Sequence, residues 1–435
     1  MDTRQEYTQT QQIADVACTL CGCVCDDLQF VIKDNRIQSM TNACEKAAAW
    51  YGQLETSDQF VRDSDHNESI LEAKIAHAAA LLRNARYPLI YGLSSSSTAG
   101  QRAAVALADR LGGVIDTSAS TCHAPSIMAF QQVGESTSSL GEARQRADLV
   151  VFWGSNPLES HPRHLERYSN APPGELLRSS DNRRTIVVVD TVESETSQIA
   201  DLFVKLDPSS DLDVIWTLRA LVKGLSVPHT EIGGVAFAQI SALADLMMNC
   251  HYGAFFFGLG LARGPLAHLN VEALLRLATD LHQKTRIVVR RMRRYGDVAG
   301  ADSVLCWQTG YPFSVDLARG YPRYQPGEFS AEGLLERQEP DCCVFVGTDS
   351  LTKLSNTALS WLQQIPTIVL THGQEHIPFQ PTVTIPVAMY GVHCAGTAYR
   401  MDEIPIPLRP MLSTELPTDE DVLNSMMTRI ENAEK

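Results

Sequence analysis

The segment Leu149-Val150-Val151-Phe152-Trp153-Gly154-Ser155-Asn156-Pro157 sets the architecture of the chain. Its first five residues are apolar, a run short enough for a buried strand. Its last four residues are small or polar turn formers, which predict a tight loop where the strand ends.

The same order of apolar strand and small polar loop recurs along the chain. Further strands are predicted at Tyr87 to Gly92, Thr185 to Val189, Gly253 to Phe257, Cys342 to Val346 and Thr367 to Leu370. Helices are predicted between them, for example at Ser69 to Ala85 and Ala99 to Leu111. Alternating strands and helices predict an α/β fold with doubly wound parallel sheets, in which ligands bind beyond the carboxyl ends of the strands.

Length and composition describe an ordinary globular protein. The chain has 435 residues, of which 44% are hydrophobic and 20% charged, enough for about two to four domains. The formal net charge of −15 argues against a nucleic-acid-binding protein, which needs a basic face. No apolar run approaches the roughly 18 residues of a membrane span, and Met1 to Gln12 is polar, so we expect a cytoplasmic location without a signal peptide.

A group of cysteines near the N-terminus has the spacing of a metal or cluster site. The four candidate ligands, in the pattern C-x2-C-x3-C-x18-C, are Cys18, Cys21, Cys25 and Cys44. A predicted hairpin, Leu28 to Ile32 and Ile37 to Met40, would return the fourth cysteine to the first three. Four thiolates can hold a [4Fe–4S] cluster or a zinc ion, and a site without metal remains an alternative. Cys23 is interpreted as a bystander.

Two other stretches are candidates for chemistry. Cys122-His123 follows a run of small residues and is either a reactive pair or a buried structural cysteine beside a histidine. Arg286 to Arg294 (RIVVRRMRR) is either a solvated strand end or subunit contact, or a cationic wall for an anionic cofactor or carboxylate. Gly258-Leu259-Gly260 lacks the third glycine of a nicotinamide fingerprint, and no Walker A motif is present.

Three longer motifs carry a resemblance to a known family. They are W-G-x-N-P-x-x-x-H-P-R-H (Trp153 to His164), G-Y-P-F-x-V-D-x-x-R-G-Y-P-R-Y (Gly310 to Tyr324) and G-T-A-Y-R-M-D (Gly396 to Asp402). With the N-terminal cysteines and Cys122-His123, the chain resembles the molybdopterin-binding B subunit of formylmethanofuran dehydrogenase over roughly residues 15 to 410. That family is related to the molybdopterin oxidoreductases, including formate dehydrogenases.

The resemblance implies roles for individual residues. Cys18, Cys21, Cys25 and Cys44 would hold a [4Fe–4S] cluster, and Cys122 would bind tungsten or molybdenum carried by bis-molybdopterin guanine dinucleotide. His123 and Arg293 would stand beside that metal, with His123 passing a proton near neutral pH. The residues expected to contact the pterin cofactors are Gly154, Ser155, Asn156, Pro157, His161, Arg163, His164, Gly258, Gly260, Gly310, Gly347, Asp349, Gly396, Thr397 and Arg400.

The resemblance also implies an architecture and an activity. We expect a [4Fe–4S] domain at residues 1–60, a pterin-binding α/β domain at 61–125 with 330–410, a second at 126–329, and a C-terminal tail at 411–435 that ends in a peripheral helix. The implied reaction is the two-electron interconversion of carbon dioxide and formate, in one-carbon metabolism and methanogenesis. Formate would be joined to methanofuran on a partner with a zinc amidohydrolase site, in a complex with A, C and D subunits. The alternative is a redox-inactive structural component of a bacterial formyltransferase/hydrolase complex.

Overall fold

The computed structural model describes residues 10–64, 68–170, 172, 176–177, 183–373 and 376–433. The chain forms two compact units. Unit 1 consists of Met1–Thr121 and Tyr295–Lys435, and unit 2 is Cys122–Arg294. Each unit is built around its own parallel sheet.

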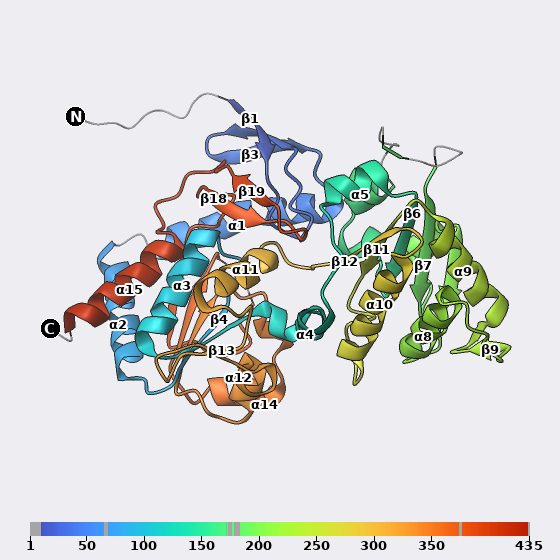
Figure 1. Cartoon of the computed structure of the whole chain (residues 1–435). Coiled ribbons are helices and arrows are strands. Elements are labelled where there is room, and N and C mark those ends of the chain that lie inside the picture. Colours follow the sequence, from blue (N-terminus) through green and yellow to red (C-terminus); the bar gives the residue numbers. More distant parts are fainter. Residues whose placement is uncertain are drawn as a thin grey trace. The chain divides into compact units, whose positions relative to one another are not determined.

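The sheet of unit 2 has five parallel strands in the order β12-β11-β6-β7-β8 (Figure 1). The strands are β6 (Leu149–Trp153), β7 (Thr185–Asp190), β8 (Leu202–Lys205), β11 (Tyr252–Phe257) and β12 (Arg286–Arg291). From β6 the chain runs outward to β8, then returns to the other side of β6 with β11. The direction of winding therefore reverses between β6 and β11, where a doubly wound sheet opens a crevice at its carboxyl edge.

Helices cover both faces of this sheet. One face packs its alternate strand residues, among them Val151, Trp153, Phe255 and Phe257, into the larger core of unit 2. The helices on that side are α4 (Ala124–Val133), α8 (Asp211–Val222), α9 (Phe237–Asn249) and α10 (Ala267–Leu281). The other face carries α5 (Leu140–Arg146) and the short helix Leu165–Ser169. The remaining short elements are α6 (Pro157–Ser160), α7 (Glu195–Gln198), β9 (Glu231–Ile232) and β10 (Val235–Ala236).

The sheet of unit 1 has seven strands in the order β14-β13-β5-β4-β15-β16-β17. Five are parallel: β4 (Pro88–Gly92), β5 (Val114–Thr117), β15 (Cys342–Val346), β16 (Thr367–Thr371) and β17 (Val383–Pro386). Two short antiparallel strands, β13 (Val315–Asp316) and β14 (Arg323–Tyr324), extend it beyond β5. Here the winding reverses between β4 and β15, which gives unit 1 a crevice position of its own.

The helices of unit 1 also lie on two faces. One core contains side chains of α2 (Glu68–Asn84), α3 (Thr98–Leu111), α11 (Val298–Thr309) and α15 (Asp419–Ala433). The opposite core contains side chains of α13 (Ala331–Glu336) and α14 (Asn356–Leu362), preceded by α12 (Pro326–Phe329). Two 3-10 turns are Ser118–Thr121 and Leu351–Lys353.

The C-terminal helix is not peripheral, which corrects the expectation from the sequence. Val422, Leu423, Met426 and Ile430 of α15 are buried in the core shared with α2 and α3. Their spacing places them on one face of the helix, and that face is wide enough to join the core.

The N-terminal cysteines belong to a small antiparallel sheet in unit 1. Its strands are β1 (Gln11–Val16), β2 (Leu28–Lys33) and β3 (Arg36–Thr41), followed by α1 (Glu45–Ser64). A second hairpin, β18 (Gly396–Tyr399) and β19 (Pro405–Leu408), shares a hydrophobic cluster with Ala17 and Val24. The predicted hairpin between Cys25 and Cys44 is confirmed.

The six strands and two helices named from the sequence form within one residue of their predicted bounds, and the α/β class is confirmed. The iron–sulfur domain and the division into three domains and a tail stay predictions. Among the described residues, none of the helices combines the length and apolarity that crossing a membrane requires.

Candidate functional site

The four predicted cluster ligands lie in one neighbourhood of unit 1. Cys18, Cys21 and Cys25 lie in the loop between β1 and β2, which is closed by a hydrogen bond from Cys18 N to Cys25 O of 2.8 Å. Cys44 directly precedes α1, and its Sγ accepts a hydrogen bond from Ala47 N at 3.5 Å. Burial raises the pKa of Cys44 above its ordinary value, and hydrogen bonds from the backbone at the start of α1 lower it in part.

These thiols affect one another electrostatically. Burial raises the pKa of the Cys18 thiol well above its ordinary value, and the thiols of Cys21, Cys25 and Cys44 raise it further. Hydrogen bonds to Cys21 and Cys25, together with burial, raise the pKa of Cys23. Cys23 therefore lies among the other cysteine side chains rather than apart from them, which the spacing alone did not indicate.

The donor set consists of thiols, which suit either an iron–sulfur cluster or a zinc ion. Within the described part of the chain, no three His, Cys, Asp or Glu side chains are grouped as ligands of one metal ion. One zinc ion draws its four sulfurs to about 2.3 Å from a common centre. A cubane cluster binds one thiolate at each iron corner and so holds them farther apart. The [4Fe–4S] cluster at these four thiols stays a prediction.

Cys122 and His123 begin unit 2, immediately before α4. Pro125 lies in the first turn of α4, where its missing N–H costs no hydrogen bond. Cys122 is buried, and His123 is completely buried. The Nδ1 of His123 lies 3.1 Å from Ser126 Oγ, and its Nε2 lies 3.3 Å from Met292 O.

The environment of His123 keeps its ring neutral. Burial lowers the pKa of His123 well below its ordinary value, and the charges of Arg293 and Arg291 lower it further. Because a carbonyl oxygen can only accept, the nitrogen facing Met292 O carries the proton of the neutral ring. A role for His123 in proton transfer stays a prediction.

The crevice of unit 2 contains a pocket of about 260 Å³. The loop after β6 contributes Gly154, Ser155, Asn156 and His161, and the loop after β11 contributes Gly258 and Gly260. The structure thus brings six of the predicted cofactor-binding residues together at the position where the winding of the sheet reverses. Met292 and Arg294, after β12, also line the pocket. Both belong to the basic stretch Arg286 to Arg294, one interpretation of which is a wall for an anionic cofactor, although neither was named as a cofactor-binding residue.

Three glycines let the two loops of this pocket approach each other. Gly258 N donates to Trp153 O at 3.0 Å, and Gly260 N donates to Gly154 O at 3.0 Å. A Cβ on Gly154 would lie 2.5 Å from Leu261 N, and one on Gly258 would lie 2.5 Å from Gly154 O. Side chains are therefore excluded from a backbone-lined cradle, as an extended nucleotide requires.

Two histidines after β6 have different environments. His161 Nε2 donates to Arg293 O at 2.6 Å, so this ring fixes the backbone after β12. His164 contacts the rings of Phe152, Phe256 and Tyr168, and its Nδ1 lies 3.0 Å from Ser169 Oγ. Burial lowers the pKa of His164 to about 3. Its fully buried Nε2 has no hydrogen-bond partner within the described chain.

Three of the five arginines between Arg286 and Arg294 are buried: Arg290, Arg291 and Arg293. Arg290 Nε donates to Ser138 O at 2.8 Å, and Arg291 pairs with Glu135 at 3.8 Å. Arg293 is 2% exposed. Arg286, at the start of the strand, and Arg294, after its end, are exposed.

Fewer of the predicted cofactor-binding residues lie where the winding of the sheet of unit 1 reverses. Asp349, after β15, accepts hydrogen bonds from Ser94 and Ser95, which follow β4. Gly347 has φ +82° and lies against Ser95. These contacts join the loops after β4 and β15, between which the winding of this sheet reverses.

The other predicted cofactor residues have local structural partners. Gly310 is the left-handed C-cap of α11. Gly396 and Thr397 belong to β18, and Arg400 forms a two-fold ion pair with Asp402 at 2.7 and 2.8 Å. In unit 2, Arg163 pairs with Glu166, and Pro157 begins α6. Their roles toward a cofactor stay predictions.

No family model matches the chain. Two curated proteins are similar to it over nearly their whole length. The B subunit of tungsten-containing formylmethanofuran dehydrogenase 2 from Methanocaldococcus jannaschii is 34% identical, over 96% of this chain and 98% of that protein. The protein of the same name from Methanococcus maripaludis is 32% identical over the same shares. The B subunit of the formyltransferase/hydrolase complex Fhc from Methylorubrum extorquens is 24% identical over 64% of this chain and 72% of that protein.

Two solved structures share the fold. A chain of the formyltransferase/hydrolase complex FhcABCD from Methylorubrum extorquens, crystallised with methylofuran, matches with a TM-score of 0.71 at 21% identity, over 84% of this chain and 97% of that chain. Acetylene hydratase from Pelobacter acetylenicus matches with a TM-score of 0.60 at 10% identity, over 83% of this chain and 59% of that chain.

Proposed function

Because the chain belongs to the family of formylmethanofuran dehydrogenase B subunits, we propose that it is a working redox subunit that interconverts carbon dioxide and formate. We propose further that it acts within a multi-subunit complex whose A, C and D partners join formate to methanofuran. A zinc amidohydrolase site on a partner would carry out that second step. The complex would work in the cytoplasm, in one-carbon metabolism.

The cofactors of this proposal are a [4Fe–4S] cluster and bis-molybdopterin guanine dinucleotide with tungsten or molybdenum. Cys18, Cys21, Cys25 and Cys44 would hold the cluster, and Cys122 would supply a soft sulfur ligand to the metal. The cradle formed by Gly154, Gly258 and Gly260 would hold nucleotide or pterin groups through backbone contacts. When bound, these groups supply two-electron chemistry at the metal and one-electron transfer through the cluster.

The residues of unit 2 would shape the site around that metal. His161 and His123 lie within hydrogen-bonding distance of the consecutive carbonyl oxygens of Arg293 and Met292 and so hold the backbone after β12. Arg293 would orient the carboxylate substrate and stabilise its charge. Burial of these groups excludes water, which strengthens electrostatic interactions with a bound anion.

The observation that carries the proposal is the complete thiol set. Cys21, Cys25 and Cys44 lie close enough to Cys18 to raise the pKa of its thiol, and Cys122 is buried at the start of unit 2. A protein that serves only as a scaffold does not need any of these sulfurs, because buried structural positions accept other small apolar residues.

The alternative is a redox-inactive component of a formyltransferase/hydrolase complex. It is favoured by the similarity to the B subunit of Fhc, which covers 64% of this chain. Under this alternative, the chain would support hydrolase activity on another subunit and would carry little metal.

The substitution Cys122→Ala distinguishes the two functions. The complex should be purified without oxygen and assayed for reduction of carbon dioxide with a strong reductant. We expect Cys122→Ala to abolish this activity while the subunits remain assembled. The matched control, Cys306→Ala, removes an exposed cysteine of unit 1 and should retain wild-type activity. Full carbon dioxide reduction in Cys122→Ala would overturn the redox proposal.

A further inference from the structure

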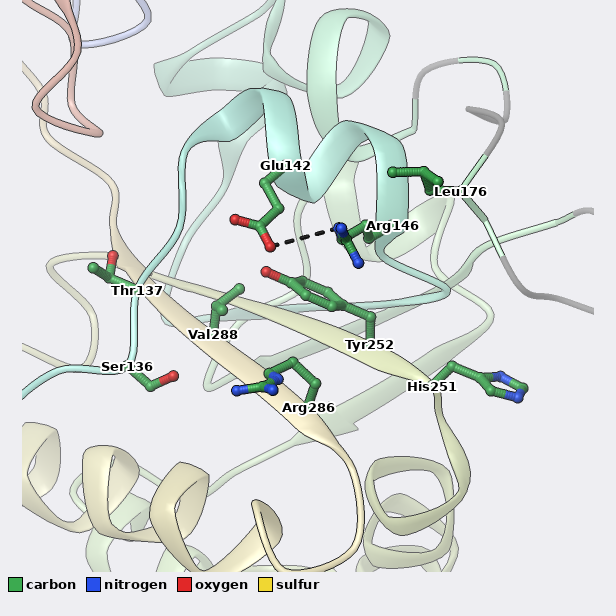
Figure 2. A pocket seen from close by; sticks show the side chains of 9 residues that line it. All are labelled: Ser136, Thr137, Glu142, Arg146, Leu176, His251, Tyr252, Arg286 and Val288. Atoms are coloured by element: carbon green, nitrogen blue, oxygen red, sulfur yellow. Dashed lines mark ion pairs between the residues drawn. The ribbon is translucent and has the colours of Figure 1, made fainter.

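A second pocket of unit 2 lies at the edge of the sheet opposite the crevice. Its volume is about 510 Å³. It is lined by the loop between α4 and α5, by α5, and by the first residues of β11 and β12 (Figure 2). Because Tyr252 and Arg286 begin their strands, the pocket opens at the amino ends of the sheet. It is therefore separate from the cofactor crevice of the same unit.

One cation in this pocket is uncompensated. Arg146 pairs with Glu142 at 3.6 Å, and His251 pairs with Asp148 at 3.0 Å. Figure 2 shows the His251 ring pointing away from the other lining side chains. The Arg286 side chain is exposed and, within the chain that the structure describes, makes no hydrogen bond or ion pair. The pocket therefore has one guanidinium available for an anion.

Further donors and an apolar wall surround this guanidinium. The Thr137 side chain is exposed and likewise has no polar partner in the described chain. Burial raises the pKa of Tyr252 to about 12, so its phenol stays protonated at neutral pH. In Figure 2 the ring of Tyr252 lies between Arg146 and Arg286, and the side chain of Val288 lies beside that ring. They give the pocket an apolar surface next to its charge.

We propose that this pocket binds a small organic monocarboxylate. The carboxylate would form a two-fold ion pair with Arg286, a geometry that guanidinium groups favour. The apolar body of the acid would pack on Tyr252 and Val288. The volume lies in the range of small-molecule sites, about 300–1,000 Å³.

The charge balance favours a monocarboxylate over a phosphate. A phosphate group carries close to two negative charges at neutral pH, whereas one cation of the pocket is unpaired among the residues that the structure describes. Glu142 also lines the pocket, so a second negative charge would be repelled. This inference does not depend on the redox function proposed above, since the site lies at the other edge of the sheet.

The test is the binding of benzoate to the purified complex, measured by titration calorimetry. Benzamide is the neutral analogue of the same shape, and inorganic phosphate is the second anion. We expect one benzoate per chain, with benzamide and phosphate each binding at least about ten-fold more weakly, since benzamide cannot form the ion pair and phosphate carries a second charge.

Two matched variants locate the binding. Arg286→Gln should weaken benzoate binding by at least about ten-fold. Arg276→Gln, which removes an exposed arginine of α10 outside the pocket, should leave it unchanged. Absence of saturable benzoate binding, or equal affinity in Arg286→Gln and the wild type, would overturn the inference.

A third probe identifies the source of the carboxylate. N-acetylglutamic acid α-amide presents the side chain of a glutamate within a peptide. Tighter binding of this probe than of benzoate would assign the pocket to an acidic side chain of another protein. Tighter binding of benzoate would assign it to a free organic acid. Equal weak binding of both probes and of phosphate would show only general attraction of anions and would contradict the proposal.

Discussion

At the scale of single residues, glycine decides how the cofactor crevice of unit 2 is built. Gly154 has φ +55° and faces the backbone of Gly260 and Leu261. Any side chain there would push apart the two loops whose hydrogen bonds close the end of β6 against the end of β11. The close approach, more than backbone freedom alone, explains why three glycines occur in these loops.

Gly154→Ala should therefore destabilise the protein by about 2–4 kcal/mol, the sum of left-handed strain and a steric clash with backbone atoms. The control is Gly224→Ala, because Gly224 has φ +73° but no atom within 4 Å of its Cβ position. It should lose only about 1 kcal/mol, the strain without the clash. Both values can be measured by urea unfolding. Equal losses in the two variants would show that the clash at Gly154 is relieved by loop movement.

The burial of His164 makes the stability of the protein depend on pH. Burial lowers its pKa from 6.5 to about 3, so the unfolded chain binds a proton between these values and the folded chain does not. The contribution of His164 to the free energy of unfolding is therefore fully present above pH 6.5 and is lost as the pH falls toward 3. Between pH 7 and pH 5 the loss should be about 2 kcal/mol.

The variant His164→Phe removes the titrating group but keeps an aromatic ring among Phe152, Phe256 and Tyr168. We expect its stability to fall less steeply than that of the wild type between pH 7 and pH 5, measured by urea unfolding at several pH values. The same slope in both proteins would contradict burial of a neutral ring at this position.

At the scale of elements, the strands could be predicted because their apolar runs end in recognisable turns. β6 and β15 begin and end where the sequence indicates. The position of α15 could not be predicted in the same way. Its apolar face is visible in the sequence, but only the fold shows that α2 and α3 present a matching surface.

The candidate site was also predictable in part. Gly154 and Gly258 follow strands, so their meeting at a reversal of winding follows once the strand order is known. Strand order depends on long-range pairing, which a single sequence does not encode locally. The Arg400–Asp402 ion pair and the place of Cys23 among the thiols depend on side-chain contacts that spacing does not reveal.

The role of α15 as a core element can be tested by Met426→Ala. Met426 is completely buried between α2 and α3, and its truncation should cost about 2–5 kcal/mol because a cavity remains. Thr428→Ala, on the exposed side of the same helix, should change stability by less than about 0.5 kcal/mol. Thermal or urea unfolding compares the two. A negligible effect of Met426→Ala would mean that the helix is peripheral after all.

At the scale of the whole molecule, each unit carries a parallel sheet with one reversal of winding, and unit 1 adds the thiol-bearing sheet at its N-terminal end. The cofactor proposed above is bis-molybdopterin guanine dinucleotide, and the crevice of unit 2 would hold part of it. The net charge of −15 favours solubility and gives no general attraction for anions. Binding of such a cofactor must therefore come from local features, namely backbone cradles and buried arginines.

The central claim is that this chain carries a redox metal and an iron–sulfur cluster. The most direct test is elemental analysis of the complex purified without oxygen, for the wild type and for Cys21→Ser. The account predicts about one tungsten or molybdenum atom per chain in the wild type, and a loss of about four iron atoms per chain in Cys21→Ser. A wild-type complex without tungsten or molybdenum, with the same iron content in both proteins, would contradict it.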